Sequence, residues 1–149
     1  NVCYRMVGER REAEDLAQEA FIRAYGRFSL FDVEKSFGPW IRRVAVNVCL
    51  NKLQHKDAVS VELDEERNTL AAQPLQNPEK ALENAQTAQA LRSALGELTP
   101  HYRAVIELRH FQELSYAEIA EQLHLPLSDV KSHLFRARRL LAEKLRSYA

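Results

Sequence analysis

The stretch that most constrains this chain is residues 115–141, SYAEIAEQLHLPLSDVKSHLFRARRLL, which has the pattern of two helices joined by a tight turn. Ser115 is a good helix cap, and Glu118, three positions later, completes the pattern of a capping box. Pro126 interrupts the helical period, and Ser128 is a candidate cap for the next helix. The spacing therefore predicts a short helix, a turn and a long second helix.

The second helix of this pair is predicted to have one apolar face and one basic face. Residues 129–146 hold six Lys or Arg against two acids, in a chain whose net charge is zero. Phe135 falls within the polar face, where an aromatic ring needs a partner such as a thymine methyl group. This favours a helix-turn-helix that places its second helix in the DNA major groove; a packed pair with a solvated basic face is the alternative. The candidate DNA-contacting residues are Ser128, Lys131, Ser132, Phe135, Arg136 and Arg139.

Composition disfavours several other classes of protein. The 149 residues are 46% apolar and 28% charged, and no apolar run approaches the ~20 residues of a membrane span. Without a secretory leader, we expect a cytoplasmic protein. Cys3 and Cys49 are too few for a disulfide framework, and the five His are scattered, so we expect buried reduced thiols, no metal and no cofactor. The sequence shows no pattern of a nucleophile with its base and no Gly-rich phosphate loop, so we do not expect an enzyme.

Charge is segregated along the chain. Residues 1–56 carry ten Lys or Arg against seven acids, residues 57–91 carry two against seven, and residues 92–149 carry nine against seven. Two mildly basic blocks thus flank an acidic connector. We predict an all-α protein of two small helical domains, residues 1–56 and 78–149, joined by an extended acidic linker at 57–77.

The first long helix is predicted over residues 12–27. Its apolar side consists of small residues and Leu16, with Phe21 beside them. The opposite side is acidic and contains an exposed Ile, which suggests a protein partner with a basic surface, although taken alone the pattern favours a merely solvated face. The residues concerned are Asp15, Gln18, Glu19 and Ile22. Because the chain begins at Asn1 in an apparent helix, we expect an upstream part of this domain to be missing.

A second predicted helix begins at Pro39 or Trp40 and ends near Lys56, after a loop that contains Phe28 and Phe31. One stripe of this helix carries an Arg followed by amide side chains. Aromatic rings, amides and an Arg are the groups that stack on and hydrogen-bond to unpaired bases, although a surface stripe of this kind is often only solvated. The residues of the stripe are Arg43, Asn47, Asn51 and Gln54.

The carboxy-terminal block is predicted to hold four helices. Asn77 and Pro78 form a cap followed by a proline, and Thr99 and Pro100 repeat that device. The helix-turn-helix pair follows the second of these starts. We therefore predict that this block is a helical domain whose last helix is the candidate DNA-binding helix.

In order and spacing, these blocks resemble the extracytoplasmic-function (group IV) sigma factors of bacterial RNA polymerase. AEDLAQEAFIRAY resembles the region-two helix that docks on the β′ clamp helices, and FDVEKSFGPWIRRVAVNVCLNKL resembles the segment that opens and reads the −10 element. LGELTPHYRAVIELRHFQELSYAEIAEQLHLPLSDVKSHLFRARRLL resembles region four, which reads the −35 element. The resemblance covers nearly the whole chain.

The resemblance implies a role for each candidate surface. Asp15, Gln18, Glu19 and Ile22 would bind core polymerase, whose β flap is a further expected contact of region four. Phe31 and Asn47 would hold a flipped base of the −10 strand. Arg43 and Lys52 would contact its phosphates, and Asn51 would lie beside them. Trp40 would serve either as a core anchor or as a wedge that separates the strands. The six helix-turn-helix residues would face the −35 groove, and an anti-sigma factor would compete for these surfaces. Many members carry Asp and Arg where this chain has Asn51 and Gln54.

A stand-alone helix-turn-helix regulator is the alternative function. Such a protein would bind palindromic DNA as a dimer without polymerase. A sigma factor would instead act as a monomer bound to core enzyme. Neither reading requires a small-molecule substrate or membrane insertion.

Overall fold

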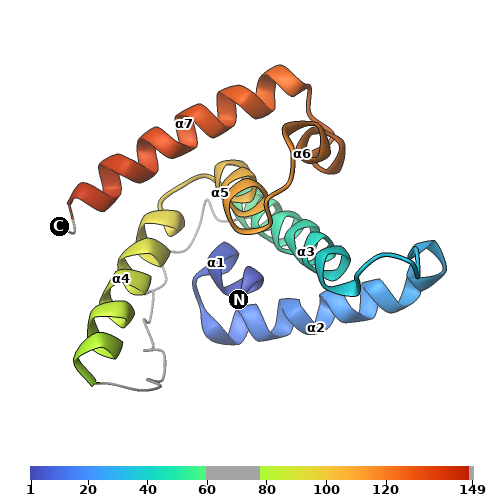
Figure 1. Cartoon of the computed structure of the whole chain (residues 1–149), viewed down its shortest axis with the longest axis horizontal. Coiled ribbons are helices and arrows are strands. Elements are labelled where there is room, and N and C mark those ends of the chain that lie inside the picture. The colour runs from blue at the N-terminus through green and yellow to red at the C-terminus, as the bar shows by residue number, and fades with distance from the viewer. Residues whose placement is uncertain (60–77, 148–149) are drawn as a thin grey trace.

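The computed structural model describes residues 1–59 and 78–147, and the regular structure in these two ranges is entirely helical (Figure 1). This confirms the predicted all-α class. In Figure 1 α7 and α2 form two opposite edges of the molecule, and α1, α3 and α5 lie between them. The elements are α1 (Val2–Val7), α2 (Arg10–Gly26), a 3-10 turn η1 (Phe28–Leu30), α3 (Phe37–Val59), α4 (Pro78–Gly96), α5 (Pro100–Ile106), a π-helical turn η2 (Glu107–Phe111), α6 (Tyr116–Leu123) and α7 (Leu127–Arg146).

The amino-terminal unit is built by α1, α2 and α3. Gly8 ends α1 in the left-handed conformation, with φ of 77°, and its N–H donates to the Tyr4 carbonyl over 2.9 Å. Glu9 then caps α2, because its carboxylate accepts hydrogen bonds from the backbone N–H groups of Glu12 and Arg11. These bonds lower the pKa of Glu9. The chain therefore reverses sharply between α1 and α2, which lets both helices pack on α3.

Helix α3 begins earlier than the sequence predicted. It starts at Phe37 rather than at Pro39 or Trp40, because a proline in the first turn lacks an N–H that would have no partner there in any case. The helix also continues to Val59, so the expectation that the linker begins at residue 57 was wrong for 57–59. The rest of the predicted linker, 60–77, lies outside the described residues.

The helix-turn-helix is present, with one correction to its caps. The capping box is confirmed, since the Ser115 Oγ accepts from the Glu118 N–H over 3.1 Å and the Glu118 carboxylate accepts from the Ser115 N–H over 3.1 Å. Ser128 is not the cap of α7; Pro126 occupies that position without a side-chain hydrogen bond. Between the helices His124 adopts φ of 54°, a left-handed conformation that glycine usually fills.

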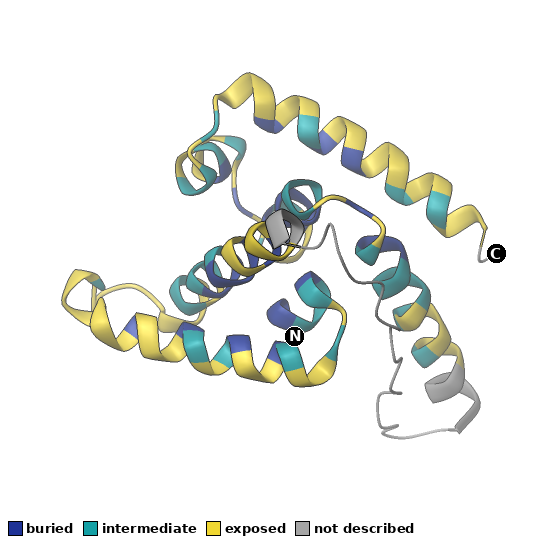
Figure 2. Ribbon diagram, turned by 180° about the vertical axis from the view of Figure 1, so that it is seen from behind, coloured by how far each residue is buried: buried dark blue, intermediate teal, exposed yellow. Residues whose placement is uncertain are grey.

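The two units pack directly against each other. Buried side chains from α1, α3, α5 and α7 form one continuous apolar cluster, and Figure 2 shows the buried residues concentrated on the inner faces of these helices. Across the junction Arg5 of α1 donates to both carboxylate oxygens of Glu107, over 2.7 Å and 2.9 Å. Arg103, 8% exposed, donates to the carbonyls of Met6 and Leu98. The Arg5–Glu107 pair and the bond from Arg103 to the Met6 carbonyl therefore connect the two units directly.

Candidate nucleic-acid interface

The exposed face of α7 has the predicted composition. Val130, Leu134 and Ala137 are buried against α5, which turns the opposite side of the helix outward. Phe135 is 68% exposed on that outward side, as the pattern predicted. We define the α7 face as Lys131, Ser132, Phe135, Arg136 and Arg139, all exposed, with Ser128 at its amino-terminal end, also exposed.

Basic side chains border a hollow beside this face. The hollow, about 560 Å³, is lined by Tyr116, Lys131, Phe135, Arg138 and Arg139. The Arg138 Nε donates to the His110 Nε2 over 3.0 Å, which requires the imidazole to accept at that nitrogen. Partial burial, together with the charges of Arg138 and Arg109, lowers the pKa of His110. A neutral imidazole thus holds one arginine at the edge of the α7 face.

The loop before α3 gathers four aromatic rings. Phe31 lies at the centre, with ring centroids 5.6 Å from Phe28, 5.8 Å from Phe37 and 4.9 Å from Trp40. Phe28 and Phe37 are 51% and 41% exposed, so the cluster opens to solvent on one side. Phe31 itself is half-buried beneath its neighbours. A base entering this cluster would stack on an existing aromatic surface.

The polar stripe of α3 is partly covered by α6. The Arg43 Nη2 donates to the Glu118 Oε2 over 2.8 Å, and the Gln122 amide donates to the Arg43 carbonyl over 3.1 Å and to the Asn47 Oδ1 over 3.5 Å. Further along the helix Asn51 and Lys52 are exposed. The structure therefore brings the stripe and the helix-turn-helix together, an arrangement that the sequence did not predict.

The acidic side of α2 is exposed as expected. We define the α2 face as Asp15, Gln18, Glu19 and Ile22. Ile22 is 72% exposed, and Glu19 accepts from Arg23 one turn later over 2.8 Å. Helix α2 packs against α1 and α3, and its buried residues, Ala13, Leu16, Ala20 and Ala24, do not belong to this face.

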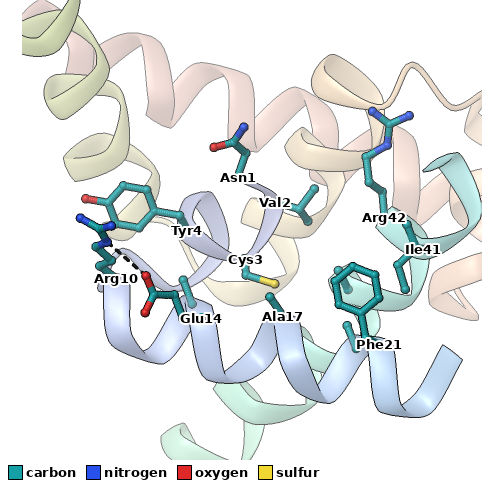
Figure 3. A pocket seen from close by; sticks show the side chains of 13 residues that line it. Asn1, Val2, Cys3, Tyr4, Arg10, Glu14, Ala17, Phe21, Ile41 and Arg42 are labelled. Atoms are coloured by element: carbon teal, nitrogen blue, oxygen red, sulfur yellow. Dashed lines mark hydrogen bonds and ion pairs between the residues drawn. The ribbon is translucent and has the colours of Figure 1, made fainter. Parts of the chain in front are cut away.

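An apolar groove of about 520 Å³ opens between α1, α2 and the start of α3 (Figure 3). In Figure 3 Tyr4 lies at one end of the groove, and Phe21 and Ile41 lie at the other. Phe21, assigned by its period to the apolar side, is 58% exposed. The Cys3 thiol lines the groove and contacts that of Cys49; both cysteines are free and buried, as predicted. The hydrogen bond to Cys3, with burial, raises the pKa of Cys49.

Sequence reasoning missed the residues that join the two units. Glu118 was assigned only to a capping box, and Gln122 received no role. Arg103 and Glu107 offered a usable signal, since two charges within a run of buried residues need partners. The partner of Glu107, Arg5, is 102 positions away, and no local pattern connects them.

Comparison with known proteins identifies the family. Sigma-70 region 2 matches residues 1–59 and Sigma-70, region 4 matches residues 88–141, in the order that the structure follows. The chain is 36% identical to the ECF RNA polymerase sigma factor SigW of Bacillus subtilis, over 97% of this chain and 81% of that protein. The chain belongs to the extracytoplasmic-function sigma factors. Sigma factors of this family act in transcription initiation by RNA polymerase, and this chain shares that function.

Other sigma factors are similar over most of their length. The RNA polymerase sigma-H factor of Pseudomonas aeruginosa is 30% identical over 95% of this chain and 77% of that protein. Among solved structures, the sigma factor RpoE in complex with the anti-sigma factor NepR from Bartonella quintana matches with a TM-score of 0.69, at 22% identity, over 97% of this chain and 88% of that one. CnrH in complex with the cytosolic domain of CnrY matches with a TM-score of 0.62, at 22% identity, over 99% and 80%. These two likenesses concern the fold.

Within residues 1–59 and 78–147 no helix is long and apolar enough to span a membrane. In the same ranges no group of three or more His, Cys, Asp or Glu side chains is placed to hold a metal ion.

Proposed function

We propose that this sigma factor reads promoter DNA with two separate surfaces, the α7 face on the −35 duplex and the α3 stripe with its aromatic cluster on the melted −10 strand. The observation that carries the proposal is the exposure of Phe135 among Lys and Arg side chains on a helix whose other side is buried. An aromatic ring between cations fits a groove that offers both thymine methyls and phosphates. The corresponding units are residues 1–59, the end of α3, and 78–149, with 60–77 assigned as the connector.

At the −35 element different side chains of the α7 face would contact different groups of the DNA. Arg136 and Lys131 are the candidates for bidentate or single hydrogen bonds to guanine edges, and Phe135 for a thymine methyl. Arg139, which pairs loosely with Glu143 over 3.5 Å, is placed for phosphate contact. Ser128 and Ser132 lie one turn apart and supply short donors to the backbone.

At the −10 element the aromatic cluster would receive a flipped base. Phe31 provides a stacking surface that is already supported by Phe37 and Trp40, so little ordering entropy remains to be lost when a base enters. Arg43 and Lys52 would hold phosphates, and Asn47 would hydrogen-bond the base edge. Trp40, in contact with both phenylalanine rings, serves in this scheme as the floor of the site.

Protein partners would use the remaining exposed surfaces. The α2 face offers an apolar side chain, Ile22, surrounded by acids, which suits docking on a basic surface of core polymerase. Changing Asp15 and Glu19 to Ala should weaken core binding while leaving duplex binding by the α7 face intact; normal core binding by that variant would refute the assignment. By analogy with the NepR and CnrY complexes, an anti-sigma factor is a further expected partner.

In vitro transcription tests the proposal most completely. The full chain is combined with core RNA polymerase on a promoter library, and run-off products are sequenced. We expect products that share a two-element consensus, with Arg136→Ala altering preference at the upstream element and Phe31→Ala reducing strand opening more than initial binding. Transcripts without a two-element consensus, or an inverted-repeat operator bound by a dimer without core enzyme, would contradict it.

A further inference from the structure

The chain has two cysteines, Cys3 in α1 and Cys49 in α3, and their thiols are hydrogen-bonded to each other where these two helices pack together. Cys3 lines the apolar groove described above. We propose that the two side chains form an oxidation site for peroxides, in which Cys3 is attacked first and Cys49 then closes a disulfide that joins α1 to α3. The promoter-binding scheme uses neither thiol, so the two proposals are independent.

Access distinguishes the two thiols. Cys3 is 5% exposed, whereas Cys49 is 0% exposed. Figure 3 shows the Cys3 side chain among the residues that line the groove of about 520 Å³. A groove of that volume admits a peroxide, because a single water molecule takes up only about 30 Å³ of liquid. A small oxidant can therefore reach the Cys3 sulfur in the folded chain, while Cys49 is reached only through Cys3.

The hydrogen bond gives the two thiols different reactivity. The pKa of Cys3 is lowered, chiefly because the Cys49 thiol donates to its sulfur. The same hydrogen bond, together with burial, raises the pKa of Cys49. Since the thiolate is the reactive form of cysteine, Cys3 is the nucleophile of the pair. Cys49 is held against it as a neutral thiol, where it can resolve the oxidised product.

Oxidation takes two steps. The Cys3 thiolate attacks one oxygen of a peroxide ROOH, the O–O bond breaks, and Cys3 becomes a sulfenic acid while the released alkoxide takes up the proton that Cys3 had lost. The Cys49 sulfur then attacks the Cys3 sulfur, the S–S bond forms, and the hydroxyl leaves as water with the proton of Cys49. The two thiols together lose two electrons, and the peroxide is reduced to ROH and water. A thiol reductant restores the pair.

The disulfide would lie inside the amino-terminal unit. Asn47 and Asn51 of the α3 stripe are each two residues from Cys49, which in a helix places them on a different side from the buried thiol. The bond therefore leaves the stripe facing outward. Because it links residues 3 and 49, it constrains the unfolded chain and should raise the thermal midpoint by about 5–10 °C.

The test exposes the reduced full chain to hydrogen peroxide, blocks the remaining thiols with iodoacetamide and maps the products by mass spectrometry. A disulfide is recognised as the tryptic fragment 44–52 joined to the fragment that ends at Arg5. Dimedone traps any sulfenic acid. The variants Cys3→Ser and Cys49→Ser are treated in parallel, with circular dichroism to establish that each is folded; where one is not, the wild-type map and midpoint decide.

We expect the wild type to lose both free thiols together, to form the disulfide within one molecule and to regain its thiols with dithiothreitol. Cys49→Ser should accumulate dimedone-labelled Cys3, whereas Cys3→Ser should leave Cys49 unoxidised at the same dose. Only the oxidised wild type should show the raised midpoint. Thiols that survive peroxide in the folded wild type, oxidation of Cys49 in Cys3→Ser, disulfides between molecules, or an unchanged or lowered midpoint would overturn the inference.

Discussion

The α7 face and the α3 stripe are both candidate DNA surfaces, but they differ in how far other parts of the chain cover them. Lys131, Phe135 and Arg136 point to solvent, whereas Arg43 and Asn47 are engaged by α6. An open surface can meet duplex DNA without rearrangement, while a covered one must first exchange its internal partner. The difference means that the α3 stripe must lose its bonds to Glu118 and Gln122 before it is fully accessible, whereas the α7 face is accessible already.

The largest expected effect tests the junction that keeps the stripe covered. Glu107→Ala leaves Arg5 without its carboxylate in a largely buried position and should lower the free energy of unfolding by about 3 kcal/mol. Urea denaturation followed by circular dichroism measures this. The exposed pair of Arg10 and Glu14 is the control: Glu14→Ala should change stability by less than about 1 kcal/mol. Equal losses in the two variants would remove the distinction between junction and surface.

A second prediction concerns the open face. Arg136→Ala should cost about 1–3 kcal/mol of discrimination at one position of the −35 duplex, since an arginine that reads a base edge is worth that amount. Competition binding with single-base variants of the duplex measures it. A uniform loss across all sequences, with a shallower salt dependence, would assign Arg136 to a phosphate instead.

A third prediction concerns the turn that sets the angle between α6 and α7. His124 occupies the left-handed region at φ of 54°, which costs a non-glycine residue about 1 kcal/mol. His124→Gly should therefore stabilise the chain by up to about 1 kcal/mol and leave the α7 face unchanged. Thermal unfolding measures the gain. Loss of stability would mean that the imidazole makes a contribution larger than the strain it relieves.

The smallest expected effect is a pH dependence at the edge of the α7 face. His110 has a lowered pKa in the folded chain, so the unfolded chain takes up the proton first as the pH falls. Its contribution to stability is complete above the ordinary pKa of about 6.5 and is lost as the pH falls through the lower folded value. The difference between the urea midpoints measured at pH 7.5 and at pH 5.5 should be smaller in His110→Gln than in the wild type. An unchanged difference would exclude His110 as the source.

Local patterns predicted what depends on neighbours in the sequence. The capping box of Ser115 and Glu118 follows from a three-residue spacing, and the exposure of Ile22 and Phe135 follows from helical period. The misassigned cap at Ser128 is equally local: Pro126 already has the backbone conformation that precedes a helix, so α7 begins two residues earlier than a cap at Ser128 would place it.

Contacts between distant segments were not accessible in the same way. Arg43 and Glu118 are 75 positions apart, and each has a complete local explanation, one as a stripe residue and the other as a cap. Period and composition carry no information on which face of one unit meets which face of the other. Only the charges at Arg103 and Glu107, within a buried run, signalled that a partner was required.

Energy transfer between α3 and α6 tests the central claim most directly. Dyes are attached to cysteines introduced at His55 and Ala117, both exposed and outside the proposed contacts; the native Cys3 and Cys49 are buried. We predict high transfer in the free chain and low transfer once core polymerase and promoter DNA are bound, because the two units then reach separate elements. High transfer in an open promoter complex that yields transcripts would contradict the account.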